Sequence, residues 1–214
     1  LQKTVFAPNG LQTVTVYNIA GKISRLKNLD FKGEVLTEEE FIYDPAQHLV
    51  CKKRKEKEQE THFYYDPAGH LIKKVFAAAA PAPYTYEYFY DEGGRLLQTV
   101  RPDGIKINYR YDFLGRCCGI KTSDNSCCYL YSYNAAGHLL QIEDVKEGLF
   151  VKRKYNAAGQ LQAETLANRF VLQRQYDDLS RPTALFLPGN AAVFREYDAP
   201  FFKKNNVSEC CGSL

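Results

Sequence analysis

The sequence predicts an all-β protein built from tandem antiparallel β-hairpins, and three observations lead to this fold class. A Tyr followed by Asp or Asn recurs along the chain, apolar and polar residues alternate between the copies, and aromatic residues make up 14% of a composition that lacks Trp and Met. Alternation with a period of two is typical of half-buried strands, and Tyr and Phe favour sheets. We therefore expect strands joined by short turns.

The recurring dipeptide defines a repeat. Successive copies lie 26, 22, 25, 21, 22, 22, 21 and 21 residues apart, and the third residue after the Asp or Asn is Gly in six of the nine copies. The other three copies have Gln47, Ser180 and Phe201 there. A regular period of this length indicates a repeat architecture, so we expect one array over residues 1–214. The repeat tyrosines are Tyr17, Tyr43, Tyr65, Tyr90, Tyr111, Tyr133, Tyr155, Tyr176 and Tyr197.

Residues 102–117 illustrate the unit. Pro102-Asp103-Gly104 is typical of a turn, residues 105–111 alternate with Ile and Tyr on one face, and a second turn is expected at residues 112–115. Asp112 can bond the backbone two residues on, and Gly115 can adopt the left-handed conformation that closes a hairpin. Two turns leave two strands of about seven residues each, so each repeat is predicted to be a β-hairpin.

Three segments depart from the regular spacing. Residues 29–40, which lie in the longest gap and include Glu38-Glu39-Glu40, are interpreted as a loop. Residues 51–60 carry Lys52-Lys53-Arg54-Lys55 followed by acidic residues, and we interpret this run as a solvated hairpin tip rather than a polyanion-binding signal. Residues 77–83, rich in Ala with two Pro, are expected to form another tip.

Nine hairpins correspond to about 18 strands. Open twisted sheets rarely exceed about ten strands without curling or splitting, so we expect the hairpins to join into a long curled strip.

The residues also resemble a known family. The stretch Tyr90-Asp91-Glu92-Gly93-Gly94-Arg95-Leu96, followed by Pro102-Asp103-Gly104, is similar to the YD repeat of the RHS (rearrangement hotspot) family, and the resemblance covers essentially the whole chain. That family includes bacterial polymorphic toxins, components of insecticidal toxin complexes, wall-associated proteins and the teneurins. In it, hairpins join into a strip that spirals into a hollow β-shell.

The resemblance implies a role and a location. It implies a non-catalytic structural segment, an arc of a shell that encapsulates or displays another domain, and partners that are other repeats or domains of the same polypeptide, among them an enclosed toxin domain. It also implies a secreted or cell-surface location. A sequence without an initial Met suggests an excerpt of a longer protein.

An alternative function is carbohydrate binding or adhesion at the surface. Tyr84, Tyr86, Tyr88 and Tyr90 alternate along one predicted strand and so form an aromatic row on one sheet face. Aromatic faces can stack on sugar rings, although tyrosines in the same register of later repeats favour packing within the sheet. This row is the only candidate ligand site that the sequence provides.

Signals for other chemistry are weak. Three of the four histidines, His48, His70 and His138, occupy the polar position after the Gly of the repeat, which predicts a role in the turn rather than in a metal or catalytic site. The repeat aspartates are interchangeable with Asn, so they are expected to form turns. We therefore predict no enzyme, no cofactor and no metal site. A net charge of +3 and the lack of a long apolar run predict neither a nucleic-acid partner nor a membrane span.

The seven cysteines allow two interpretations. Cys117-Cys118 and Cys127-Cys128 flank a predicted turn near residues 123–124, where a cross-strand disulfide would suit an exported protein. Alternatively, the thiols are reduced and Cys117 is a small apolar residue in the sheet. Neighbouring residues of a strand point to opposite faces, so these pairs are not expected to bind one zinc ion together.

Overall fold

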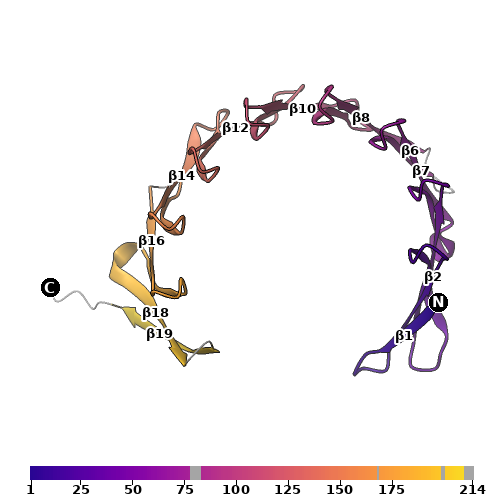
Figure 1. Cartoon of the computed structure of the whole chain (residues 1–214), viewed down its shortest axis with the longest axis horizontal. Helices are drawn as coiled ribbons and strands as arrows, with labels where there is room; N and C mark the ends of the chain where they lie inside the picture. Colours follow the sequence, from indigo (N-terminus) through magenta and orange to yellow (C-terminus); the bar gives the residue numbers. More distant parts are fainter. Residues whose placement is uncertain (78–82, 168, 199–200, 210–214) are drawn as a thin grey trace. The chain divides into compact units, whose positions relative to one another are not determined.

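The computed structural model describes residues 1–77, 83–167, 169–198 and 201–209. These residues form 19 β-strands and two short 3-10 segments, and no α-helix occurs among them. The prediction of an all-β fold made of tandem hairpins is confirmed. The chain divides into two compact units, Leu1–Asn108 and Tyr109–Leu214, and the strands of each are drawn in sequence colours in Figure 1. That residues 1–214 form one array stays a prediction.

The first unit holds nine complete strands and the start of a tenth. They are β1 (Gln2–Phe6), β2 (Gln12–Tyr17), β3 (Ile23–Leu29), β4 (Val35–Tyr43), β5 (Leu49–Arg54), β6 (Gln59–Tyr65), β7 (Leu71–Ala77), β8 (Tyr84–Tyr90), β9 (Leu96–Val100) and β10 (Lys106–Tyr111), with the 3-10 segment η1 (Lys55–Lys57) between β5 and β6. Each of these strands pairs antiparallel with the next one along the chain.

The second unit continues the same pattern. Its strands are the rest of β10, β11 (Cys117–Thr122), β12 (Cys128–Tyr133), β13 (Leu139–Asp144), β14 (Leu149–Tyr155), β15 (Leu161–Thr165), β16 (Val171–Tyr176), β17 (Pro182–Phe186), β18 (Ala191–Asp198) and β19 (Phe201–Glu209), with η2 (Pro188–Asn190) before β18. From β11 to β19, successive strands pair antiparallel.

A one-residue shift in strand register, a β-bulge, occurs at the repeat tyrosines. The register shifts by one residue just before Tyr65, because Tyr64 pairs with Lys73 whereas Tyr65 pairs with Leu71. The same shift precedes Tyr17, Tyr43, Tyr90, Tyr133, Tyr155, Tyr176 and Tyr197. A β-bulge increases the local twist of a strand pair. Each repeat therefore adds a bend at the same point of the hairpin.

The strip is one layer thick and has almost no buried core. Among the described residues, the buried ones are Cys51, Ala184, Ala192, Glu39, Thr99, Thr122 and Gly119, and no large side chain is fully buried. The extensive contacts between described elements join strands that follow one another in sequence, except that β4 also contacts η1. Cohesion within each unit therefore depends on side chains that connect neighbouring strands along both faces.

The structure corrects one predicted loop and refines one predicted tip. Residues 29–40 are not a loop: they contain the end of β3, a turn at Asp30–Glu34 and most of β4, so Glu38, Glu39 and Glu40 lie within a strand. The turn was missed because Asp30 and Gly33 lack the preceding Tyr. In residues 51–60 the tip is η1 and Glu58, whereas Lys52, Lys53 and Arg54 lie on β5. Of residues 77–83, the stretch 78–82 lies outside the described residues.

Candidate functional site

The Asp or Asn of each repeat builds a turn through its side chain and backbone. At Asp66, the backbone N–H donates to the His70 carbonyl, the Gly69 N–H donates to the Asp66 carbonyl, and the His70 N–H donates to Asp66 Oδ1 at 2.8 Å. Asn156 makes the same three bonds with Gly159 and Gln160. An amide oxygen accepts a hydrogen bond as a carboxylate does, which explains why Asn and Asp both occur at this position.

The third residue of the turn adopts a left-handed backbone. Gly69 has a φ of 87°, and Gln47 and Ser180, which replace Gly in their repeats, have φ values of 67° and 65°. Gly69 also leaves room for the preceding repeat: a Cβ atom there would lie 3.2 Å from His48 Nε2. Gly at this position therefore serves both the turn and a close contact between repeats.

The tyrosine hydroxyl links each repeat to the one before it. The Tyr65 hydroxyl donates a 3.0 Å hydrogen bond to the carbonyl of Leu49, and the Tyr155 hydroxyl donates a 3.0 Å bond to that of Leu139. Burial raises the pKa of Tyr65 and of Tyr90. The further donors are Tyr43, Tyr90, Tyr133, Tyr176 and Tyr197, bonded to the carbonyls of Ile23, Leu71, Cys117, Leu161 and Pro182.

The polar residue after the turn Gly packs on the same tyrosine. The His48 ring stacks on Tyr65 with ring centroids 4.8 Å apart, and its Nδ1 lies 3.1 Å from Asp44 Oδ2. Arg116 places its guanidinium 4.7 Å from the centre of the Tyr133 ring while its Nε donates to Asp112 Oδ2. Similar contacts join His70 to Tyr90, His138 to Tyr155, Lys22 to Tyr43 and Arg181 to Tyr197.

These contacts form one device, which we call the YD clasp: the turn Asp or Asn, the polar residue after the turn Gly, and the Tyr of the next repeat with its hydrogen bond to a main-chain carbonyl. Only a planar or cationic side chain can both reach the turn carboxylate and cover an aromatic ring. The three histidines placed in the turn by their position in the sequence lie there, as expected. The clasp therefore links one repeat to the next.

The predicted aromatic row lies on β8, but its members have different surroundings. Tyr90 belongs to a YD clasp, and Tyr86 packs edge-on against Phe76 at 6.0 Å. Tyr84 stacks on Phe76 at 4.7 Å and is 46% exposed. Tyr88 also interacts with its surroundings. Tyr84 is therefore the member of the row that offers an open ring edge.

Tyr84 borders a cavity of about 330 Å³ between β5, β6 and β7. Lys74 Nζ lies 4.4 Å from the centre of the Phe76 ring, and no described carboxylate lies within ion-pair distance of it. Lys52 and Arg54 share the carboxylate of Glu39 at 2.9 Å and 2.6 Å. The cavity lining is Lys52, Arg54, Gln59, Glu60, Thr61, Phe63, Lys74, Phe76, Ala77 and Tyr84. It combines aromatic rings with a net positive charge.

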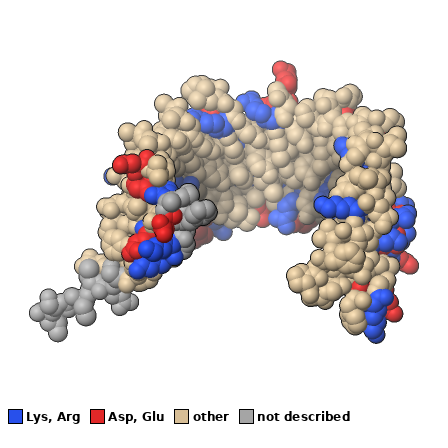
Figure 2. All heavy atoms as spheres, turned by 60° about the horizontal axis from the view of Figure 1, so that its bottom comes forward, with Lys and Arg blue, Asp and Glu red and all other residues tan. Residues whose placement is uncertain are grey.

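The basic run and the acidic run neutralise each other across three strands. On one face, Lys55 Nζ lies 3.0 Å from Glu38 and 3.1 Å from Glu40, and Arg25 also pairs with both. The Lys55 hydrogen bond is the largest cause of the lowered pKa of Glu38. On the face drawn in Figure 2, basic and acidic groups alternate in small patches. A continuous basic surface, which a nucleic-acid partner would need, does not form on that face.

The five described cysteines are free thiols, so neither pair flanking the turn forms a disulfide. The turn does lie between Thr122 and Cys127, but the register pairs Cys128 with Lys121, which leaves the two cysteine pairs at different levels of the hairpin. Cys210 and Cys211 lie outside the described residues. No helix among the described residues is long and apolar enough to cross a membrane.

Comparisons with known proteins agree with this geometry. A family model described as the teneurin YD-shell matches residues 2–184. A solved structure titled "Crystal Structure of TcdB2-TccC3-Cdc42" superposes with a TM-score of 0.71 at 14% identity, over 91% of this chain and 13% of that one. The Tc holotoxin pore of Photorhabdus luminescens, with a TccC3 mutation, gives 0.68 at 13% identity over the same shares. No curated protein sequence matches the chain.

The two toxin-complex structures share the fold, and this chain spans only 13% of the length of either. The family model covers most of the present sequence. The chain therefore belongs to the teneurin YD-shell family of RHS/YD-repeat proteins.

Proposed function

We propose that this chain is a structural segment of a YD-repeat shell that encloses or displays another domain of the same polypeptide outside the cell. The YD clasp is the observation that carries the proposal. Because Tyr65 and Tyr155 are each satisfied by a carbonyl of the preceding repeat, the wall extends by adding hairpins and needs no central core. The matched toxin-complex structures support an enclosed toxin as the cargo class.

A protease-protection experiment on the natural full-length polypeptide tests this proposal. We expect a further domain of that polypeptide to resist a protease concentration that digests the same domain in isolation. Tyr65→Ala combined with Tyr155→Ala should open the wall and speed digestion of that domain, whereas Tyr64→Ala, on the exposed side of β6, should not. A cargo domain digested equally fast in both forms, or a polypeptide without a further domain, contradicts the proposal.

A second candidate function is binding of an acidic carbohydrate in the cavity beside Tyr84. The cavity is within the size range of small-ligand sites, and its lining offers both a ring for stacking on a sugar and the Lys74 ammonium for a carboxylate or sulfate. The neighbouring tyrosines of the row are engaged in packing, so the candidate site reduces to Tyr84 with the cationic lining.

A glycan array followed by calorimetry tests the second candidate. Sialylated or sulfated glycans should bind and their neutral counterparts should not. Lys74→Met and Tyr84→Ala should each weaken binding by at least about tenfold, while Tyr64→Ala keeps it. Binding that ignores the charge of the glycan, or that survives both cavity substitutions, would rule this function out without affecting the shell proposal.

A further inference from the structure

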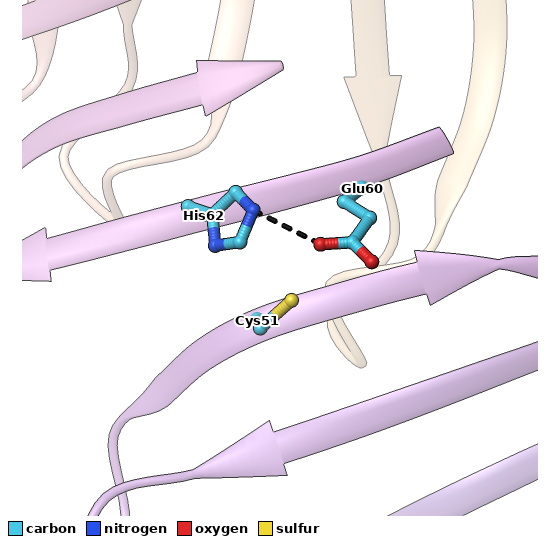
Figure 3. Close-up of side chains that lie close together, drawn as sticks. All are labelled: Cys51, Glu60 and His62. Carbon is cyan, nitrogen blue, oxygen red and sulfur yellow. Dashed lines mark ion pairs between the residues drawn. The ribbon is translucent and has the colours of Figure 1, made fainter. Parts of the chain in front are cut away.

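Three groups that can bind a metal ion converge on one face of the β5–β6 hairpin. Cys51 on β5 pairs directly with His62 on β6, and Glu60 lies two residues before His62, so the three side chains share a face. Figure 3 shows the Cys51 sulfur directed toward the gap beside the Glu60–His62 pair. Among the described residues, this is the group of His, Cys and carboxylate side chains whose donor atoms all lie within 4.8 Å of one another.

The donor atoms have a separation that suits a single zinc ion. His62 Nε2 lies 3.1 Å from Glu60 Oε2. Two atoms at this spacing can each lie about 2.0–2.1 Å from one Zn²⁺, with an angle of about 100° between the bonds, near the tetrahedral value. The Cys51 sulfur lies within 4.8 Å of both atoms, and a zinc thiolate bond of about 2.3 Å would draw it closer to them.

The neighbouring residues hold Glu60 and Cys51 in positions that suit metal binding. Lys53 donates to Glu60 Oε1 at 2.7 Å, which fixes the carboxylate and leaves Oε2 directed at His62. Cys51 is only 6% exposed, so its sulfur lies beside Glu60 and His62 with little access to solvent. A divalent cation would compensate there for the negative charge of the Cys51 thiolate.

We propose that Cys51 Sγ, His62 Nε2 and Glu60 Oε2 form a zinc site in which water supplies the fourth ligand. On binding, the Cys51 thiol releases its proton to solvent and a Zn–S bond forms. His62 binds as the neutral imidazole with its proton on Nδ1, so Nε2 exchanges its hydrogen bond with Glu60 Oε2 for a bond to the metal. Glu60 Oε2 also bonds to the metal, and the three side chains displace waters from the hydration shell of the ion. The ion then joins β5 to β6 beside the exposed tip η1. One thiolate, one imidazole and one carboxylate favour Zn²⁺ or Co²⁺ over Mg²⁺ and Ca²⁺.

An ion pair of Glu60 with His62 accounts for two of the three groups but not for the buried thiol that faces them. The sequence did not indicate the site because Cys51, Glu60 and His62 follow no common metal-ligand spacing. The signal was available once the tip was placed: residues 51 and 62 are equally distant from a tip centred between Glu56 and Lys57.

Cobalt substitution of the metal-free chain tests the site. Titration with Co²⁺ should give one equivalent of binding with the visible bands of a tetrahedral ion and a thiolate charge-transfer band, and Zn²⁺ should displace the cobalt. Cys51→Ser should remove the charge-transfer band, and His62→Gln and Glu60→Gln should weaken binding. Cys118→Ser, which removes a thiol on β11, is the matched control and should leave the spectrum unchanged.

Stability and proton release give independent readouts. Zn²⁺ should raise the unfolding temperature of the wild-type chain and of Cys118→Ser but not of His62→Gln, and binding at pH 7 should release a proton that Cys51→Ser does not release. Far-UV circular dichroism checks that the variants fold, and His62→Gln decides the result if Cys51→Ser does not fold. No binding, or a cobalt spectrum that persists in both Cys51→Ser and His62→Gln, overturns the proposal.

Discussion

At the scale of one residue, Tyr65 shows how the repeat tyrosine contacts the preceding repeat. Its ring is covered by His48 and its hydroxyl donates to Leu49, so both ends of the side chain are satisfied by the preceding repeat. The adjacent Tyr64 points to the other face, is 49% exposed and is a matched reference. The two residues have the same side chain, but only Tyr65 belongs to a clasp, whereas Tyr64 lies on the exposed face.

The clasp hydrogen bond can be measured with this pair. Tyr65→Phe should lower the free energy of unfolding by about 1–2 kcal/mol, because the half-buried Leu49 carbonyl loses its donor while the ring contact stays. Tyr64→Phe should change it by less than about 0.5 kcal/mol. Urea denaturation followed by circular dichroism measures both. Equal effects of the two substitutions would contradict the role of the hydroxyl.

Because of the turn aspartates, we expect the stability of the fold to depend on pH in the acidic range. The hydrogen bond from the Arg95 backbone N–H holds the pKa of Asp91 below its usual value of 3.8. The hydrogen bond from the Arg95 side chain lowers this pKa further. A carboxylate whose pKa is lower in the folded state stabilises the fold above its unfolded pKa, and this stabilisation disappears as the pH falls through the folded pKa. The clasps that contain Asp should therefore weaken below about pH 4.

Exchanging Asp and Asn between repeats tests this dependence. Asp91→Asn keeps the Oδ1 acceptor of the turn but cannot be protonated, so the variant should lose less stability between pH 5 and pH 3 than the wild type, both values being chosen around the usual carboxyl pKa. Asn156→Asp should lose more. Unfolding midpoints at the two pH values decide the matter, and identical pH profiles for all three proteins would refute the explanation.

At the scale of the element, β4 shows why the acidic run is not a loop. Glu39 is one of the few buried residues and bonds both Lys52 and Arg54 of β5. Glu38 and Glu40 face the opposite side, where Lys27, Arg25 and Lys55 lie close. A strand with acidic residues on both faces is stable here because β5 supplies cations to the face of Glu39, whereas β3 and η1 supply them to the face of Glu38 and Glu40.

Removing the central carboxylate should therefore be costly. Glu39→Ala should destabilise the chain by about 1–2 kcal/mol, because two partly covered cations lose a charge-assisted hydrogen bond. Glu196→Ala, which breaks an exposed pair with Lys204, should cost less than about 0.5 kcal/mol. Thermal unfolding measures the stability of the two variants, and the difference between their stabilities should become smaller in high salt. A Glu39 variant as stable as the Glu196 variant would disagree with this account.

In a turn that lacks Gly, substitution by Gly is expected to stabilise the chain. Gln47 has a positive φ, and its buried side-chain Oε1 has no hydrogen-bond partner in the described structure. Gln47→Gly should raise the free energy of unfolding by about 0.5–1 kcal/mol, since Gly adopts this backbone without strain. Ala46→Gly, one residue earlier, should lower it. Chemical denaturation measures both, and a destabilised Gln47→Gly would show that the side chain contributes contacts of its own.

At the scale of the whole molecule, the extensive contacts between described strands join strands that follow one another in sequence. Stability in such an array is close to a sum of hairpin terms and nearest-neighbour terms, so different parts can open independently. Hydrogen exchange should therefore show that strands of the first unit differ in their protection. All five residues of β1 are exposed, and it pairs with β2, whereas β5 is flanked by β4 and β6.

We expect the β1 amides to exchange at least about tenfold faster than those of β5, because opening β1 breaks a single strand interface. Exchange followed by mass spectrometry of peptides measures both strands. Deleting residues 1–11 should leave the exchange of β5 unchanged. Uniform protection of β1 and β5, or loss of protection in β5 after the deletion, would indicate a cooperative unit instead.

Much of the fold was predictable from local patterns. Alternation and the Tyr-Asp-x-x-Gly motif predicted strands, turns and the positions of the histidines in the turns, because strand faces and turn conformations depend on residues a few positions apart. Residues 29–40 were misassigned because their turn at Asp30 lacks the repeat tyrosine. Tyr84 could be placed on a row but not at the cavity that it lines together with Lys74, since that arrangement depends on how β7 pairs with β8.

The sequence by itself determined that this protein is a chain of hairpins with a reversal at each Tyr-Asp or Tyr-Asn. Only the tertiary structure decided that Tyr65 reaches the Leu49 carbonyl, that Glu39 lies between cations, and that Cys51 meets His62 and Glu60. The physical reason is strand register: a shift of one residue moves every side chain to the other face, and the register between two strands depends on tip length and on the bulges rather than on either strand alone.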